Sequence, residues 1–275
     1  MKTTTSLTVA ILMAAVSSSV WAGDSDVSRV DIGKSRNLQQ TSTSDPVDQT
    51  NPFRFSASVQ DSQPSQSVIT SAAFTPPGGS STSMTGDGQG NFSLEQSFAS
   101  QGALNLAFPD GSYSFDIQTF NPPTAYNPTI SLGGSFANSP KILNTNFNSG
   151  ALEFDSTQDF TFNWNSFTGF TNGTSEIVFH VENTPVNQFF FSPTTSTTLS
   201  GGTLQPNQTY SAYVTFFKDF QGVTDGTTQL SSLYGVETDF TIQTTPEPSS
   251  ALLACFGGVA MLAVTKFRRV VRTNS

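Results

Sequence analysis

Hydrophobic side chains recur at every second position along several stretches of this chain. Such alternation is typical of β-strands that bury one face and expose the other. The segments between these stretches are rich in Gly, Pro, Ser and Asn, which favour turns. The sequence therefore predicts an all-β fold built from antiparallel sheets. The clearest alternating stretches are residues 53–59, 113–117, 160–164, 177–181, 210–216 and 236–242.

The predicted strands fall into two groups, separated by Asn121-Pro122-Pro123. A break of this kind predicts a β-sheet domain over residues 51–123 and a β-sandwich over residues 124–245. One continuous, larger sandwich is the alternative. Residues 23–50 are polar, with few large apolar side chains and no sustained period. We expect them to form a disordered leader, because they bury too little surface to offset the entropy of ordering.

The N-terminal segment, residues 1–22, has the pattern of a secretory signal peptide. It begins with Lys2, continues through a short apolar run and ends in Val-Trp-Ala at Ala22. The run is too short for a membrane-spanning helix, although an ordinary core helix is an alternative. The pattern predicts a signal helix that signal peptidase removes by cleavage between Ala22 and Gly23, and therefore export.

The C-terminal region, residues 246–275, has three parts. Pro246-Glu247-Pro248 precedes 17 uncharged residues, 249–265, and the basic segment 266–275 follows. A helix of 17 residues reaches about 26 Å, close to the roughly 30 Å of a bilayer's hydrocarbon core. We therefore predict a transmembrane helix whose basic end stays cytoplasmic. The basic residues that follow the apolar run are Lys266, Arg268, Arg269 and Arg272.

This arrangement resembles the PEP-CTERM sorting signal of exported bacterial proteins, over roughly residues 244–272. The resemblance implies recognition by a transpeptidase of the exosortase type and removal of the tail. The precursor would lie in the inner membrane, and the product would pass to the cell envelope or extracellular matrix, often beside exopolysaccharide export. A permanent membrane anchor is the alternative.

The charge of the chain argues against nucleic acid as a partner. Between residues 23 and 248 there are 20 acidic and six basic residues, which gives a net charge of −14. Such a segment repels polyanions and anionic lipids. The single cysteine, Cys255, lies in the apolar C-terminal run, so the exported part has no disulfide. The 25 phenylalanines of the whole chain supply large core side chains instead.

The segment 204–210, Leu-Gln-Pro-Asn-Gln-Thr-Tyr, resembles the turn that enters strand F of fibronectin type III and related immunoglobulin-like domains. The resemblance implies that Leu204 and Pro206 shape the corner and that the hydroxyl of Tyr210 returns to upstream backbone, the tyrosine corner. It also implies that Trp164 is the buried tryptophan of strand B. The Ser- and Thr-rich stretch 189–203 departs from the usual spacing, so the middle strands are not assigned.

His180 is the only histidine, and alternation places it on the same strand face as Glu176 and Glu182. Imidazole and carboxylate groups together suit zinc and similar ions. A solvated strand face explains these three residues more simply, because antiparallel sheets present polar residues outward. We therefore predict no metal site here.

Other candidate chemistry is equally weak. Glu153 with Asp155, and Asp110 with Asp116, lie near each other in sequence, whereas a glycosidase pair faces across a cleft. The loop 86–91, Gly-Asp-Gly-Gln-Gly-Asn, lacks the spaced ligands of an EF-hand and predicts a turn. Phosphate-binding glycine loops and paired cysteines are missing from the sequence. We expect no catalytic site and no cofactor.

Two functions are compatible with these observations. The first is an exported structural, display or adhesion protein of the cell envelope or extracellular matrix. The second is a secreted glycan-binding module or glycan-active enzyme, which would need an exposed row of aromatic rings beside paired carboxylates. Candidate rings are Tyr113, Tyr126, Tyr213, Phe217 and Tyr234.

Overall fold

The computed structural model describes residues 26–63, 68–120 and 125–245, and these residues are almost entirely β. The prediction of an all-β fold is confirmed. One helix occurs among them, α1 (Gln101–Ala107). The strands are β1 (Val27–Gln40), β2 (Val47–Asp61), β3 (Ile69–Thr75), β4 (Thr82–Ser83), β5 (Thr85–Gly86), β6 (Phe92–Phe98), β7 (Gly111–Thr119), β8 (Ala125–Tyr126), β9 (Thr129–Leu132), β10 (Phe147–Asn148), β11 (Ala151–Asp155), β12 (Phe160–Asn163), β13 (Glu176–Val181), β14 (Asn187–Phe190), β15 (Ser196–Leu199), β16 (Thr209–Asp225) and β17 (Thr228–Thr245).

The predicted signal helix, residues 1–22, and the predicted transmembrane helix, residues 249–265, both lie outside the described residues. Within the part of the chain that the structure describes, no helix has the length and apolar character needed to cross a membrane. Both terminal helices therefore stay predictions.

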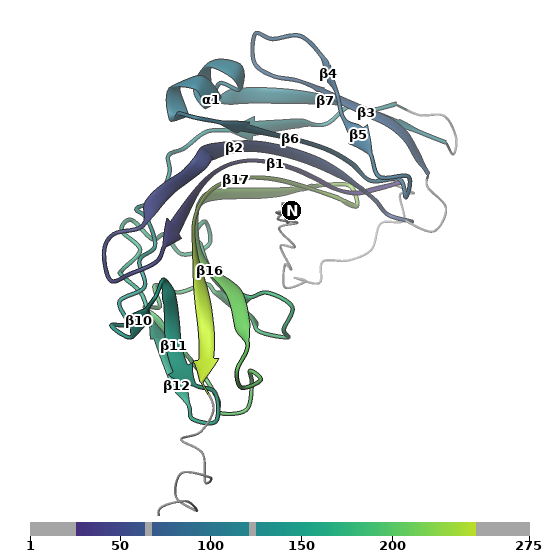
Figure 1. Ribbon diagram of the computed structural model, residues 1–275. Helices are drawn as coiled ribbons and strands as arrows, with labels where there is room; N and C mark the ends of the chain where they lie inside the picture. The colour runs from purple at the N-terminus through teal and green to yellow at the C-terminus, as the bar shows by residue number, and fades with distance from the viewer. Residues whose placement is uncertain (1–25, 64–67, 121–124, 246–275) are drawn as a thin grey trace, which may run out of the picture.

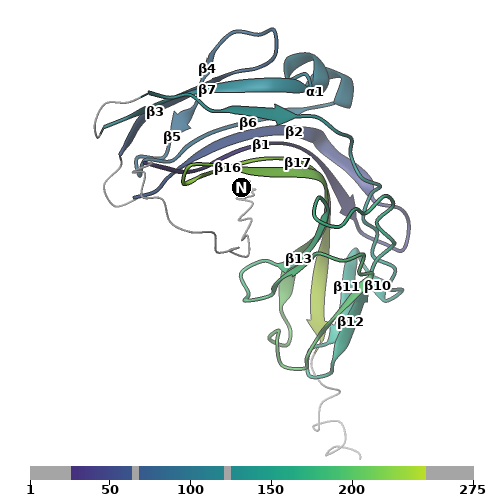
Figure 2. The same cartoon turned by 180° about the vertical axis from the view of Figure 1, so that it is seen from behind.

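A large sheet forms the frame of the molecule. Its strand order is β14-β13-β16-β17-β1-β2-β6-β5, and β11 adds to β17 with β10 beyond it. The prediction of antiparallel sheets is wrong for this sheet, because β1 and β11 both pair with β17 in parallel. Figures 1 and 2 show this sheet as an arch, in which β1, β2 and β17 curve together and β16 and β17 continue downward. Two smaller sheets pack on it, one of order β4-β3-β7-β8 with β9 also on β7, and one of β12 and β15.

Strands β1 and β17 are neighbours in the middle of the large sheet. They pair in parallel from Arg29↔Gln229 to Gln40↔Phe240. The predicted disordered leader, residues 23–50, is therefore wrong over β1 and the first residues of β2. Few of its residues are large and apolar, but Val30, Ile32 and Leu38 are almost fully buried. These few apolar side chains are sufficient to order β1, because β1 lies between the long strands β17 and β2, whose own side chains complete the buried layer.

Two hydrophobic cores lie against the same face of β17. Its Leu230 and Tyr234 belong to the first core, and its Val236 and Phe240 belong to the second. Because these are all even-numbered residues of one strand, both cores occupy one face of the sheet. The first core lies under β3, β7 and α1, which cover the convex side of the arch in Figures 1 and 2.

The domain boundary predicted at residues 121–123 is not where the β structure divides. Strands β8 and β9 follow that point in sequence, yet both pair with β7. Phe136 then packs against both cores. Strand β17 also contributes to both cores, so the predicted units 51–123 and 124–245 are packed on one shared strand. The sheet around β7 therefore contains strands from both sides of the predicted boundary.

The second core is enclosed by an immunoglobulin-like β-sandwich. Strands β13, β16 and β17 lie side by side in one layer, and β12 pairs with β15 in the other. In immunoglobulin-like domains strands C, F and G form one sheet, and strands B and E lie in the other sheet. Strands β13, β16 and β17 take the places of C, F and G, and β12 and β15 take the places of B and E. The predicted alternation is confirmed here, since Phe162, Ile177, Phe179, Val214 and Ile242 have no exposed surface.

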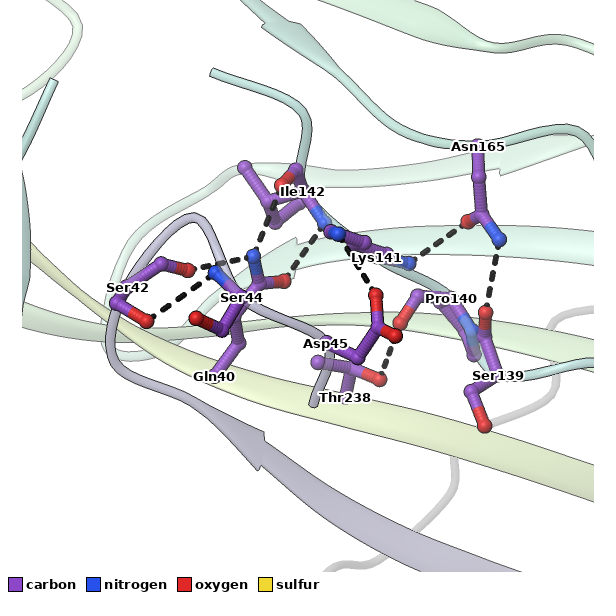
Figure 3. Close-up of polar contacts among 10 residues, drawn as sticks. All are labelled: Gln40, Ser42, Ser44, Asp45, Ser139, Pro140, Lys141, Ile142, Asn165 and Thr238. Carbon is purple, nitrogen blue, oxygen red and sulfur yellow. Dashed lines mark hydrogen bonds and ion pairs between the residues drawn. The ribbon is translucent and has the colours of Figure 1, made fainter. Parts of the chain in front are cut away.

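A polar clasp joins β1 to the segment that leads into the second core, as Figure 3 shows. The Gln40 amide donates to the Ile142 carbonyl at 2.9 Å, and its Oε1 accepts the Ile142 N–H at 2.7 Å. Thr238 donates its hydroxyl to the Pro140 carbonyl at 2.7 Å, and Lys141 pairs with Asp45 at 2.7 Å. The buried amide thus takes the place of a neighbouring strand's backbone.

Replacing Gln40 with Ala should lower the free energy of unfolding by about 2–4 kcal/mol, because a buried N–H and a buried C=O of Ile142 lose their partners. Gln39→Ala is the matched control, since the neighbouring Gln39 side chain is exposed, and it should change stability by less than about 0.5 kcal/mol. Urea unfolding followed by tryptophan fluorescence measures both. Equal effects of the two substitutions would contradict the clasp.

Candidate functional site

The tyrosine-corner contact that the sequence resemblance implies is formed. Tyr210 lies at the start of β16, and its hydroxyl accepts the backbone N–H of Gln205 at 2.9 Å. Leu204 is buried in the second core, whereas Pro206 is exposed in the turn. Trp164, directly after β12, is almost fully buried and donates its ring N–H to the Thr194 carbonyl at 2.9 Å. These residues organise the sandwich and are not placed for chemistry.

The residues predicted for sorting and processing lie outside the described residues, so their roles remain predictions. They are Ala22, Gly23, Pro246, Glu247, Pro248, Lys266, Arg268 and Arg269.

His180, Glu176 and Glu182 are not brought together as a group of metal-ligating side chains. No group of three or more His, Cys, Asp or Glu side chains suited to a metal ion occurs among the residues that the structure describes. The expected solvated strand face is also wrong in part, because Glu176 is buried and burial raises its pKa to about 7. The His180 ring lies 5.0 Å from that of Tyr213. The polar face of β13 is therefore partly covered.

Glu153 and Asp155 make only local contacts. Glu153 accepts a hydrogen bond from Asn148 at 3.0 Å, and Asp155 accepts the N–H and hydroxyl of Thr157 at 2.9 and 2.7 Å. These bonds shape the turns that flank β11.

Asp110 and Asp116 have separate partners, since Asp116 accepts from Gln118 at 2.5 Å and Asp110 binds Lys34. The loop 86–91 is a turn, as predicted. The Asp87 carboxylate accepts the N–H groups of Gln89 and Asn91 at 2.7 and 3.1 Å.

The five candidate aromatic rings do not form an exposed platform. Tyr113, Phe217 and Tyr234 are buried. Tyr126 and Tyr213 are partly buried, and the Tyr126 hydroxyl donates to Asp225 at 2.9 Å. Among the described residues the exposed large aromatic rings are Phe120 and Phe191, which follow β7 and β14 in different halves of the molecule. The exposed row that the glycan-binding alternative would need is therefore not built from these residues.

A carboxylate cluster on the inner face of the large sheet was not predicted. It consists of Glu182, Glu237 and Asp239, and the last two are odd-numbered residues of β17, so they point away from both cores. Glu237 is 5% exposed and accepts the Thr215 hydroxyl at 2.9 Å. Asp239 accepts a hydrogen bond from Gln49 of β2 at 2.5 Å. Alternation along β17 was the available signal, but it predicts a face and not its burial.

Burial dominates the electrostatics of this cluster. It raises the pKa of Glu237 to about 8, aided by the Asp239 charge, while Thr215 and Arg54 act in the opposite direction. It raises the pKa of Asp239 to about 6, against the hydrogen bond from Gln49. Burial and the nearby carboxylates also raise the pKa of Tyr213. Glu237 therefore keeps its proton at neutral pH, and a protonated carboxyl is a poor metal ligand and a poor nucleophile.

A second polar cluster surrounds Lys34 at the edge of the first core. Lys34 is fully buried, and its ammonium donates to Asn105 of α1 at 2.8 Å and to Asp110 at 2.6 Å. The Tyr234 hydroxyl also donates to Asp110. Burial acts to raise the pKa of Asp110, but Lys34 and Tyr234 outweigh it and hold that pKa below its usual range. The cluster ties α1 to β1 and β17.

Comparison with known proteins gives no family for this chain, because no family model and no curated protein sequence matches it. One similar solved structure is that of the chicken CNTN1 FN1-FN3 domains, with 12% identity and a TM-score of 0.27 over 77% of this chain and 63% of that one. Another is described as the structural basis for Dscam isoform specificity, with 10% identity and a TM-score of 0.22 over 76% of this chain and 51% of that one.

The chain thus spans less than two thirds of either structure. Likeness at these scores carries no argument about function, so the assignment of the sandwich rests on the observed strand order.

The stability of the protein should fall as the pH rises from 5 to 8. Over this range the folded protein holds protons on Glu237, Glu176 and Asp239 that the unfolded chain has released, so unfolding releases protons. Each group contributes at most about 1.4 kcal/mol per pH unit. Between pH 7 and 8 the slope should come mainly from Glu237. Urea unfolding at successive pH values measures it.

Glu237→Gln should flatten the profile between pH 7 and 8, because the amide stays neutral. The matched control is Glu95→Gln. Glu95 is an exposed residue of β6 that pairs with Arg54 of β2, and its replacement should leave the slope unchanged. A wild-type profile that rises or stays level from pH 7 to 8 would contradict the protonation of Glu237.

Tyr210→Phe should lower the free energy of unfolding by about 1 kcal/mol, because the N–H of Gln205 loses its acceptor. Tyr126→Phe, which removes an exposed hydrogen bond to Asp225, should cost less than about 0.5 kcal/mol. Chemical denaturation of both variants checks the difference. If the two variants were equally stable, the tyrosine corner would contribute nothing particular to this sandwich.

Proposed function

We propose that this chain is an exported protein of the bacterial cell envelope or extracellular matrix, with non-catalytic β-domains used for display or adhesion. The observation that carries the proposal is that the candidate catalytic side chains make structural contacts. Glu153, Asp155, Asp110 and Asp116 are all engaged in contacts within the β structure. An enzyme would leave such groups converging on a substrate site.

The termini support export. Strand β17 ends at Thr245, and the Pro246-Glu247-Pro248 motif follows directly in the sequence. Every described strand therefore ends before the proposed sorting signal, so removal of the tail would leave all of them intact. Exosortase-type processing, signal peptidase and exopolysaccharide as partners all belong to this proposal.

The glycan-binding or glycan-active alternative has no comparable support. Its candidate rings are mostly buried. The carboxylate cluster of Glu182, Glu237 and Asp239 stands beside Tyr213, but one partly buried ring is not a row of stacking platforms.

Expression in an exosortase-containing host tests sorting. Wild-type protein should reach the envelope or medium with a mass that lacks residues 1–22 and the C-terminal tail. Replacing Pro246, Glu247 and Pro248 together with Ala should leave the tail uncut and the protein in the membrane. The matched control replaces Ser249 and Ser250 with Ala and should be processed normally.

Cell fractionation and mass determination of each species measure these outcomes. Full-length wild-type protein that remains in the cytoplasm would contradict export, and equal processing of the triple variant would contradict the role of the motif.

A further inference from the structure

Strand β14 forms an open end of the large sheet. Within the described residues it pairs only with β13, in antiparallel register from Ile177↔Phe190 to His180↔Asn187. A strand paired on one side presents a row of backbone donors and acceptors on the other, which is a template for a further strand. The register of β14 and β13 contains no bulge that would turn this edge away.

The edge lacks the charges that usually protect such strands. Strand β14 reads Asn-Gln-Phe-Phe, and Phe191 follows with 58% of its surface exposed. Residues 183–217 contain no charged side chain at all, although the chain as a whole carries a net charge of −9. Lysine or an inward-pointing charge on an edge strand is a common defence against edge pairing.

The opposite end of the same sheet is protected. Strand β5 has only two residues, and Asp87 follows it directly. The neighbouring β6 carries Glu95, which lies 3.7 Å from Arg54. The two ends of one sheet therefore differ, because one is charged and short and the other is neutral and aromatic.

We propose that β14 is a self-association surface, on which β14 of a second copy adds in antiparallel orientation about a two-fold axis. The occupant must supply an extended strand, because only a strand satisfies the open backbone groups of a sheet edge. It must also approach an acidic molecule without repulsion. A second copy brings the same net charge, but its β14 region is neutral, so two copies meet most favourably there.

The side chains divide between the existing core and the new contact. Phe190 packs against Trp164 at 5.8 Å between ring centroids and belongs to the sandwich. Phe189 lies on the other face of β14, opposite Val178 of β13, and Phe191 is exposed just beyond the strand. In the pair of copies, Phe189 and Phe191 contact the partner's strand. Symmetry makes the contact isologous, so it closes as a dimer.

The contact is small, since each copy contributes four strand residues and the adjoining Phe191. It falls below the usual 1,200–2,000 Å² of stable interfaces, so we expect a weak, concentration-dependent dimer. Such a contact becomes effective where many copies are held at high local concentration.

Sedimentation velocity of the full chain in detergent tests the proposal. Wild-type protein should dimerise as its concentration rises, and the double variant Asn187→Lys with Phe191→Lys should weaken dimerisation at least tenfold by like-charge repulsion. The matched control is Phe120→Lys, which replaces an exposed ring far from β14 in sequence (69% exposed, against 58% for Phe191) and should dimerise like the wild type. Association through the apolar segment 249–265 is common to all three proteins, so it cannot produce the difference.

Cysteine cross-linking locates the axis independently of affinity. In a Cys255→Ser background, single cysteines at positions 187, 189 and 191 should give a disulfide-linked dimer on mild oxidation, at least at the position nearest the two-fold axis. Phe120→Cys should not. Unchanged circular dichroism and thermal unfolding show that each variant is folded. The proposal would be overturned if the lysine variants of β14 and Phe120 dimerised equally, or if their cysteine variants cross-linked equally. A wild-type protein that stays monomeric at all concentrations would also overturn it.

Discussion

Parallel pairing of β1 with β17 is the interaction on which the rest of the structure depends. It joins residues 29–40 to residues 229–240, so the first and last described strands lie side by side. It also runs past both cores, because Ile32 belongs to the first and Leu38 to the second. Neither core is complete without β1, and the Gln40 clasp fixes its end beside Ile142. The two halves are therefore one continuous β structure and not two independent domains joined by a linker.

This arrangement also explains the unusual acids. Both cores use one face of β17, so the other face carries Glu237 and Asp239 at the centre of a broad sheet, flanked by β16 and β1. Neighbouring strands remove water from these carboxyls even though no hydrophobic core includes them. The cost appears as a raised pKa of Glu237 and Asp239, and neutralisation by a proton is the least expensive solution for a buried carboxyl.

Much of the second half follows from the sequence, because local alternation and the turn before Tyr210 determine strand faces without knowledge of partners. The first strand did not follow. The burial of Val30, Ile32 and Lys34 depends on β17, about 200 residues away, as well as on β2, and a period of two identifies a strand's face but not its neighbours. The burial of Glu237 and Lys34 could not be predicted from the sequence for the same reason. What the sequence could not supply was pairing over long distances, which depends on topology.

Long-range pairing has a further consequence for folding. Contacts that close a loop of 200 residues form late, since the loss of chain entropy comes before the gain in contacts. The second half contains its own sandwich and tyrosine corner, so it has the local contacts to form first. The first half cannot complete its sheet until β17 is available to β1. Until β17 is available, β1 has only β2 as a pairing partner, so the edge of β1 that β17 covers stays open until the last described strand has formed.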